Sequence, residues 1–157
     1  MQRNVSNIKY IEPSVLHQWI TQNGQKTQLG QKFQVIDARG SDYIGGHIKG
    51  CWNYPYSKLK HYEEGEALMD EMFHKLETSR RDVTVETDNN IMNVVFHCAQ
   101  SQQRGPAAAM KFLRYLPDDK LSVYNILILR GGFNLWQDLY GTDTNVTADY
   151  EPDLWSW

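Results

Sequence analysis

One short stretch, residues 96–106 with the sequence FHCAQSQQRGP, combines the residue types needed for nucleophilic chemistry. Cys98 is one of the chain's two cysteines, and Arg104 follows it after five intervening residues. None of those five residues is proline, so each of them can direct a backbone N–H group into the loop. Gly105 and Pro106 then indicate the start of a helix, because proline in the first helical turn gives up no intrahelical hydrogen bond.

A loop wrapped over the start of a helix gathers N–H groups and positive dipole at one point. Such a site favours the thiolate form of Cys98, which is the nucleophilic form. It also offers donors to a tetrahedral dianion above the sulfur, where the planar guanidinium of Arg104 can bind two oxygens at once. These features predict attack by sulfur on phosphorus, with a phospho-cysteine intermediate. The same loop would accept arsenate.

The other residues of the loop are expected to bind substrate or to support those that do. The loop residues expected to surround the oxyanion are Ala99, Gln100, Ser101, Gln102 and Gln103. We expect the Ser101 hydroxyl to donate to the thiolate or to the departing sulfur, and His97 to support the loop from behind. The alternative is that Cys98 is a buried thiol near an arginine by chance; the preceding histidine, the Gly-Pro pair and the strand–helix setting favour function.

The surrounding sequence alternates between segments typical of strands and of helices. The expected strands are 7–11, 32–37, 51–56, 91–96 and 123–129, and the expected helices are 12–22, 62–76, 106–116 and 130–140. The polar segment 77–90 is expected to be an exposed excursion. This pattern predicts an α/β domain over residues 1–157, with a mostly parallel sheet flanked by helices on both faces. Parallel strands end at one edge of a sheet, so we expect the cysteine loop at that edge.

Composition narrows the classes of function. The chain has 157 residues, of which 41% are hydrophobic and 22% charged, and its net charge is -3. No basic field favours nucleic acid or anionic lipid, and no apolar run has the length of a membrane span. Two cysteines and no signal-peptide pattern predict reduced thiols in the cytoplasm, with the nucleus as a second compartment. The histidines have no metal-ligand spacing, so we expect neither a metal nor a cofactor.

The stretch HCAQSQQRGP resembles the active-site signature of the M-phase inducer (cell-division-cycle) phosphatases, His-Cys-x-x-Ser-x-x-Arg-Gly-Pro, and the loop of the fungal-type arsenate reductases. VIDARGSDYIGGHIKGCWN and ILRGGFNLW are similar to two segments of rhodanese-like domains. The resemblance covers about residues 8–140 and implies a rhodanese-like fold with a five-stranded parallel sheet. It also implies a loop one residue longer than that of the sulfurtransferases, which ranks sulfur transfer below phosphate or arsenate chemistry.

The leading hypothesis is a small stand-alone cysteine-dependent phosphatase of tyrosine or dual-specificity type, acting on a phosphorylated protein or a small aryl phosphate. The second hypothesis is an arsenate reductase, for which the resemblance implies glutathione and glutaredoxin as reductants. The third is a phospho-binding module without catalysis.

The sequence departs from the M-phase inducer pattern at several positions. Ala99 and Gln103 stand where the M-phase inducers carry acidic residues, so the acid that protonates the leaving group is unassigned. Ala38 stands where they have a second cysteine, so no rescue of oxidised Cys98 by Cys51 is expected.

Several residues outside the loop have weaker claims. Asp37 and Arg39 are expected to form a buried ion pair that fastens the loop to the sheet; direct contact with substrate is the alternative. Asp149, Glu151 and Asp153 are the nearest spare acids, and solvated charges explain them as well. The aromatic residues of the C-terminal tail are expected to pack back onto the domain, where Trp155 or Trp157 could form a rim of the site.

Overall fold

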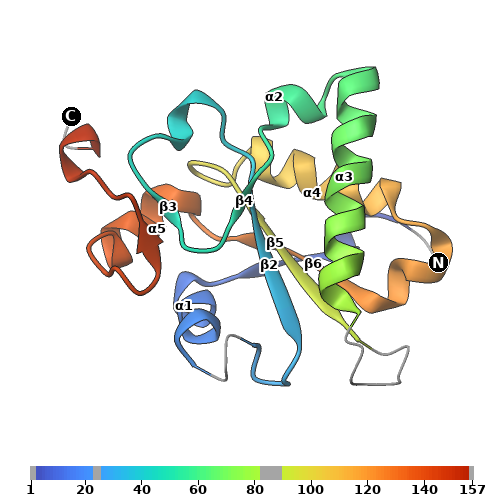
Figure 1. Cartoon of the computed structure of the whole chain (residues 1–157), viewed down its shortest axis with the longest axis horizontal. Helices are drawn as coiled ribbons and strands as arrows, with labels where there is room; N and C mark the ends of the chain where they lie inside the picture. The colour runs from blue at the N-terminus through green and yellow to red at the C-terminus, as the bar shows by residue number, and fades with distance from the viewer. Residues whose placement is uncertain (1–2, 23–25, 82–89, 156–157) are drawn as a thin grey trace.

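The computed structural model describes residues 3–22, 26–81 and 90–155, and a five-stranded sheet runs through its centre (Figure 1). The strands lie in the order β1-β6-β5-β2-β4, and every neighbouring pair is parallel. Their bounds are β1 Ile8–Ile11, β2 Lys32–Asp37, β4 Trp52–Asn53, β5 Met92–His97 and β6 Tyr124–Leu129. A second, two-stranded sheet pairs β3 His47–Ile48 with β7 Thr147–Ala148 in antiparallel fashion.

Helices cover both faces of the central sheet (Figure 1). They are α1 Pro13–Thr21, α2 Tyr56–Leu59, α3 Tyr62–Arg80, α4 Arg104–Tyr115 and α5 Gly132–Tyr140. One core cluster joins the sheet to α3 and α4, through Met72 and Phe112 among others. The second cluster joins the other face to α1 and α5, through Leu16 and Trp136. The predicted α/β architecture, with a parallel five-stranded sheet between helices, is confirmed.

The side chains of β5 explain why this strand lies at the centre. All six residues of β5 are buried. Val94 and Phe96 belong to the core under α3 and α4, whereas Val95 belongs to the core under α1 and α5. A strand whose alternate side chains enter two cores carries apolar side chains on both faces. β5 therefore delivers Cys98 to the carboxyl edge from the middle of the sheet.

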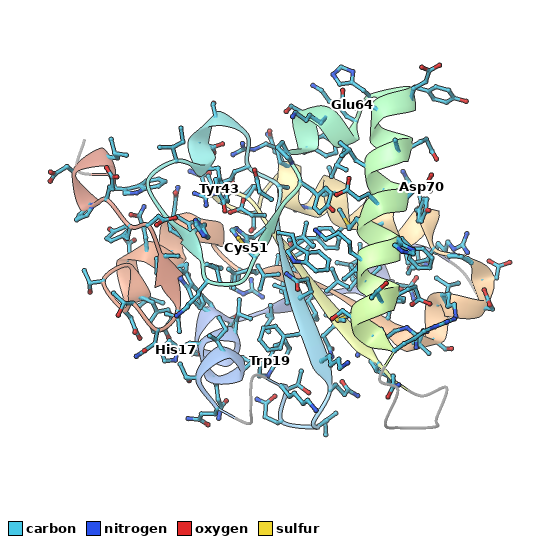
Figure 2. All side chains as sticks on the ribbon, in the orientation of Figure 1. His17, Trp19, Tyr43, Cys51, Glu64 and Asp70 are labelled. Carbon is cyan, nitrogen blue, oxygen red and sulfur yellow. The ribbon has the colours of Figure 1, made fainter. Side chains whose placement is uncertain are left out.

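Helix α3 shows the opposite pattern, with one face buried and one in solvent. Met69, Met72 and Leu76 are buried against the sheet. Figure 2 shows Glu64 at the upper end of α3 and Asp70 on the right-hand side of the helix, away from the sheet, and both residues are exposed. Among the described residues, no helix is long and apolar enough to cross a membrane.

Several element bounds differ from the sequence-based expectation. The expected strand 51–56 pairs only over Trp52–Asn53, because its partner β2 ends at Asp37, opposite Asn53, and α2 begins at Tyr56. Helix α3 continues to Arg80, where a salt bridge to Glu77 fixes its last turn. The expected exposed excursion is thus partly helical, and residues 82–89 lie outside the described residues. Helix α4 begins at Arg104 rather than Pro106, and the β3–β7 pair was not expected.

Candidate active site

The cysteine loop connects the end of β5 to the start of α4. Cys98 directly follows the strand, its residue is only 3% exposed, and Arg104 is the first residue of the helix. Ser101, midway along the loop, has a left-handed backbone with φ of 57°, which turns the chain sharply. A pocket of about 360 Å³ opens in the loop, lined by Cys98, Ala99, Gln100, Gln102, Gln103 and Arg104.

The start of α5 binds the outer side of this loop. The backbone N–H of Phe133 donates to the Cys98 carbonyl at 2.9 Å, and that of Asn134 donates to the Ala99 carbonyl at 2.8 Å. Gly132 permits this approach: its φ is 58°, and a Cβ there would lie 2.5 Å from both carbonyl oxygens. The segment ILRGGFNLW, which resembles a segment of rhodanese-like domains, therefore anchors the cysteine loop through two of the loop's carbonyl groups.

The start of α4 lies equally close to the end of β5. A Cβ on Gly105 would lie 3.0 Å from the Cα of His97, so only glycine fits without movement of the strand. This contact brings the N-terminus of a twelve-residue helix against the base of the loop. The N–H groups and positive dipole of that terminus favour an anion at this point.

Arg104 has a partner that the sequence analysis missed. Its Nη1 and Nη2 donate to the two carboxylate oxygens of Asp42, at 2.8 and 2.7 Å. Hydrogen bonds from Arg104 lower the pKa of Asp42 below its usual range, although partial burial opposes this. The pKa of Arg104 is raised, first by Asp42 and in lesser part by Cys98, which places guanidinium, carboxylate and sulfur in one site. Asp42 is 62 residues from Arg104, and no motif spacing pointed to it.

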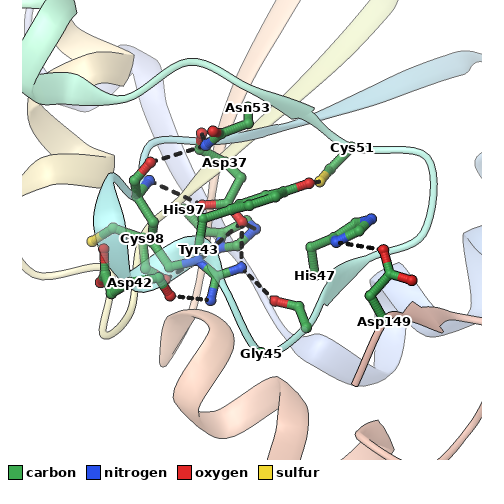
Figure 3. A network of polar contacts seen from close by, with 12 residues as sticks. Asp37, Asp42, Tyr43, Gly45, His47, Cys51, Asn53, His97, Cys98 and Asp149 are labelled. Atoms are coloured by element: carbon green, nitrogen blue, oxygen red, sulfur yellow. Dashed lines mark hydrogen bonds and ion pairs between the residues drawn. The ribbon is translucent and has the colours of Figure 1, made fainter. Parts of the chain in front are cut away.

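Asp37 and Arg39 form the buried ion pair that the sequence analysis favoured over contact with substrate (Figure 3). Neither side chain is exposed, and Arg39 Nη2 lies 2.7 Å from Asp37 Oδ2. Burial alone would raise the pKa of Asp37, but the positive charge of Arg39 and the hydrogen bonds that it donates lower the pKa overall. Arg39 also donates to the backbone carbonyls of Asp42, at 3.1 Å, and of Gly46, at 2.8 Å. The pair therefore fastens the loop that carries Asp42.

His97 lies beneath the cysteine loop and is fully buried. Its Nδ1 is 3.1 Å from the Cys98 carbonyl oxygen, which can only accept, so Nδ1 carries the proton. Burial lowers the pKa of His97 despite the nearby carboxylate of Asp37, whose Oδ2 is 3.6 Å from Nε2. We conclude that His97 is neutral at pH 7 and that Arg39 supplies the charge that balances Asp37.

The structure places the remaining candidates as follows. The Ser101 hydroxyl is buried and makes no hydrogen bond to any described residue, and Ser101 is not among the residues that line the pocket. Cys51 lies at the far end of the network in Figure 3 from Cys98, and burial raises the pKa of its thiol to about 12. It therefore remains a protonated thiol at neutral pH.

The C-terminal tail packs back onto the domain as far as Trp155. The indole Nε1 of Trp155 donates to the Gly45 carbonyl at 2.8 Å, and its ring lies 5.5 Å from that of Phe133. Asp149 is mostly exposed and lies 4.0 Å from His47, while Glu151 is exposed. Trp157 lies outside the described residues. Within residues 3–22, 26–81 and 90–155, no group of three or more metal-ligating side chains could hold a metal ion.

Comparison with known proteins gives one family. A family model described as a rhodanese-like domain matches residues 16–139. The CDC25-like phosphatase YCH1 of Saccharomyces cerevisiae is 48% identical over 152 residues, which are 97% of each chain. Arsenate reductase 2.2 of Oryza sativa is 48% identical over 109 residues, covering 68% of this chain and 70% of that protein. M-phase inducer phosphatase 1 of Homo sapiens is 32% identical over 136 residues, covering 81% of this chain and 22% of that protein.

Solved structures agree with these relatives. The structure of Ygr203w, described as a yeast protein tyrosine phosphatase of the rhodanese family, superposes with a TM-score of 0.84 at 46% identity. The match covers 97% of this chain and 99% of that one. The resemblance to M-phase inducer phosphatases and arsenate reductases is thereby confirmed at the level of homology.

Proposed function

Since the chain belongs to the rhodanese-like family and is a homologue of CDC25-like phosphatases, we propose that it is a cysteine-dependent phosphatase of tyrosine or dual-specificity type. One observation carries the proposal: Cys98 and Arg104 line the same small pocket, at the start of a helix. A Cys98 thiolate in this pocket would lie beside an anion-binding site formed by the N–H groups of the helix start and by the Arg104 guanidinium. Its substrate would be a phosphorylated protein or a small aryl phosphate.

The proposed reaction has two steps. In the first, the Cys98 thiolate attacks phosphorus, an S–P bond forms, and the bond from phosphorus to the leaving oxygen breaks. Arg104 and the backbone amides of residues 99–103 bind the equatorial oxygens, whose charge they stabilise. In the second step, water attacks phosphorus, the S–P bond breaks, and inorganic phosphate leaves with the thiolate restored. No metal or cofactor takes part in either step.

The pocket-lining side chains offer no acid to the leaving oxygen. Ala99 and Gln103 line the pocket, and neither can donate a proton as a carboxylic acid does. Asp42 is the carboxylate held against Arg104, and its lowered pKa keeps it ionised at neutral pH. The leaving group must therefore depart as an anion or take its proton from solvent. This favours aryl over alkyl phosphates, because a phenolate is the better leaving group.

The direct test is phosphate release from p-nitrophenyl phosphate by the wild type, Cys98→Ser and Arg104→Lys. We expect turnover by the wild type and none by Cys98→Ser. Lysine keeps the charge of Arg104 but loses the planar fork, so Arg104→Lys should lose at least about 100-fold in kcat/KM. Equal turnover by the wild type and Cys98→Ser would refute the proposal.

Arsenate reduction is the second candidate, and the rice relative named arsenate reductase favours it. In this reaction the Cys98 thiolate would displace water from arsenate to form an S–As bond. Two molecules of glutathione would then supply the two electrons, and arsenite and glutathione disulfide would be released as the S–As bond breaks and the thiol is restored. Arsenite production that requires glutathione and glutaredoxin, and that Cys98→Ser abolishes, would support it. Rapid phosphatase turnover without arsenite production would exclude it.

A further inference from the structure

The bidentate contact between Asp42 and Arg104 occupies part of the group that must bind the substrate oxyanion. We infer that Asp42 is a positioning residue: its carboxylate fixes the guanidinium so that the remaining donors face an oxyanion above Cys98. The inference rests on the proposed function, because it concerns how the same site binds its anion. No motif in the family resemblance stated above assigns a role to Asp42.

The number of N–H donors on Arg104 supports a positioning role for Asp42. A guanidinium has five N–H groups in a planar fork, and Asp42 takes one on Nη1 and one on Nη2. Three N–H groups remain, enough for two oxygens of a tetrahedral anion. The Arg104 side chain is 36% exposed, so an unpaired guanidinium would sample many rotamers. Two parallel hydrogen bonds remove most of that freedom before the substrate arrives, which lowers the entropic cost of binding.

Asp42 is itself held in place by contacts that connect it to the central sheet (Figure 3). Its backbone carbonyl accepts from Arg39 at 3.1 Å, and its Oδ1 accepts from the Gly40 N–H at 3.1 Å. Arg39 is bound in turn to Asp37, the last residue of β2. A rigid element therefore supports Arg39, Arg39 supports the loop, and the loop presents a carboxylate to Arg104. Such support is expected of a group whose function depends on orientation.

If Asp42 instead competed with the substrate for Arg104, its removal would change anion binding in the opposite direction. A carboxylate beside the pocket could compete with the substrate for Arg104 and repel a dianion. Removal of that negative charge would then tighten the binding of an oxyanion. Removal of a positioning group must weaken it, because Arg104 loses its fixed orientation. The sign of one binding change therefore separates the two roles.

The experiment measures binding of tungstate, an unreactive tetrahedral dianion, by isothermal titration calorimetry. All proteins carry Cys98→Ser, so that neither turnover nor thiol chemistry contributes. Asp42→Asn keeps the size of the side chain but removes its charge and one acceptor. We expect its Kd to rise about tenfold or more. The matched control is Asp118→Asn, which removes the same charge from an exposed pair with Arg3 beyond the other end of α4 and should leave the Kd unchanged.

A Kd for Asp42→Asn that is equal to or lower than that of the parent would overturn the inference. Unfolding temperatures of all variants show whether each is folded at the temperature of the titration. In the active background, Asp42→Glu should recover part of kcat/KM for p-nitrophenyl phosphate, because it restores a carboxylate. A merely structural role would not distinguish Asp42→Glu from Asp42→Asn in this way, and equal values would count against positioning.

Failure of the proposed function has a different signature. A wild type that binds tungstate but turns over neither p-nitrophenyl phosphate nor arsenate would refute the function, while the binding comparison would still decide the role of Asp42. A parent that binds no tungstate would refute both.

Discussion

Replacement of Arg39 by methionine should destabilise the protein strongly. The substitution removes the positive partner of Asp37 while Asp37 stays fully buried. It also removes the donors to the Asp42 and Gly46 carbonyls and the stacking of the guanidinium on Phe133, whose ring centre is 4.3 Å away. Breaking a buried pair by removing one partner costs about 3–5 kcal/mol, because an uncompensated charge remains in the core. For a chain of this length that corresponds to a fall in Tm of roughly 6–20 °C.

The assay is equilibrium urea unfolding, supported by thermal unfolding followed by circular dichroism. The control is Glu12→Gln, which removes the partner of Arg130 in a pair whose side chains are 54% and 55% exposed. An exposed pair is worth at most about 1 kcal/mol, so the control should unfold almost as the wild type does. Replacing both members by Asp37→Asn with Arg39→Met should recover part of the loss, because no buried charge is then left unpaired. If Arg39→Met lowered the free energy of unfolding by less than about 1 kcal/mol, the conclusion that the Asp37–Arg39 pair holds the loop in place would be refuted.

Three further predictions follow from particular contacts. Gly132→Ala should destabilise the fold by clearly more than Gly30→Ala. Both glycines have a positive φ, where an alanine costs about 1–2 kcal/mol. A Cβ on Gly132 would also clash with two carbonyl oxygens of the cysteine loop, whereas a Cβ on Gly30 meets nothing within 4 Å. Equal losses in urea unfolding would contradict the packing of α5 on the cysteine loop. Burial would raise the pKa of Glu77, but Arg80 and Tyr124 lower it to about 2. The ionised Glu77 should therefore contribute ~2 kcal/mol to the free energy of unfolding, in full above pH 4.5, and this contribution should be lost as the pH falls towards 2. The stability difference between wild type and Glu77→Gln should therefore vanish in acid; a constant difference would contradict the ion pair. Across a series of aryl phosphates, kcat/KM should fall steeply as the leaving phenol becomes less acidic, and a flat series would reveal a proton donor.

Much of the fold could be predicted because its signals are local. The largely apolar runs that became β5 and β6 enter cores on both faces, and a strand covered on both faces is recognised by its richness in apolar residues. The cysteine loop was equally readable, since nucleophile, arginine and helix start lie within nine residues. The segment ILRGGFNLW was recognised by its resemblance to rhodanese-like domains, but its binding to the Cys98 carbonyl depends on two segments that meet only in the folded chain.

The unpredicted features depend on contacts that neither partner reveals by itself, some of them between distant residues. Asp42 pairs with Arg104 across 62 positions, and nothing in its neighbouring sequence marks it as different from a solvated acid. Helix α3 extends to Arg80 because that side chain is held by Glu77 and by the Asn90 carbonyl. β4 is short because its partner β2 ends at Asp37, opposite Asn53, and the register of the two strands cannot be known from either strand alone.

The most direct test of the central claim is mass spectrometry of the protein after acid quench during turnover of an aryl phosphate. The proposed mechanism predicts a peptide containing Cys98 that carries one phosphoryl group, formed within the first turnover and absent from Cys98→Ser. Release of phosphate with no phosphorylated Cys98 at any time point, at a rate that Cys98→Ser leaves unchanged, would contradict it.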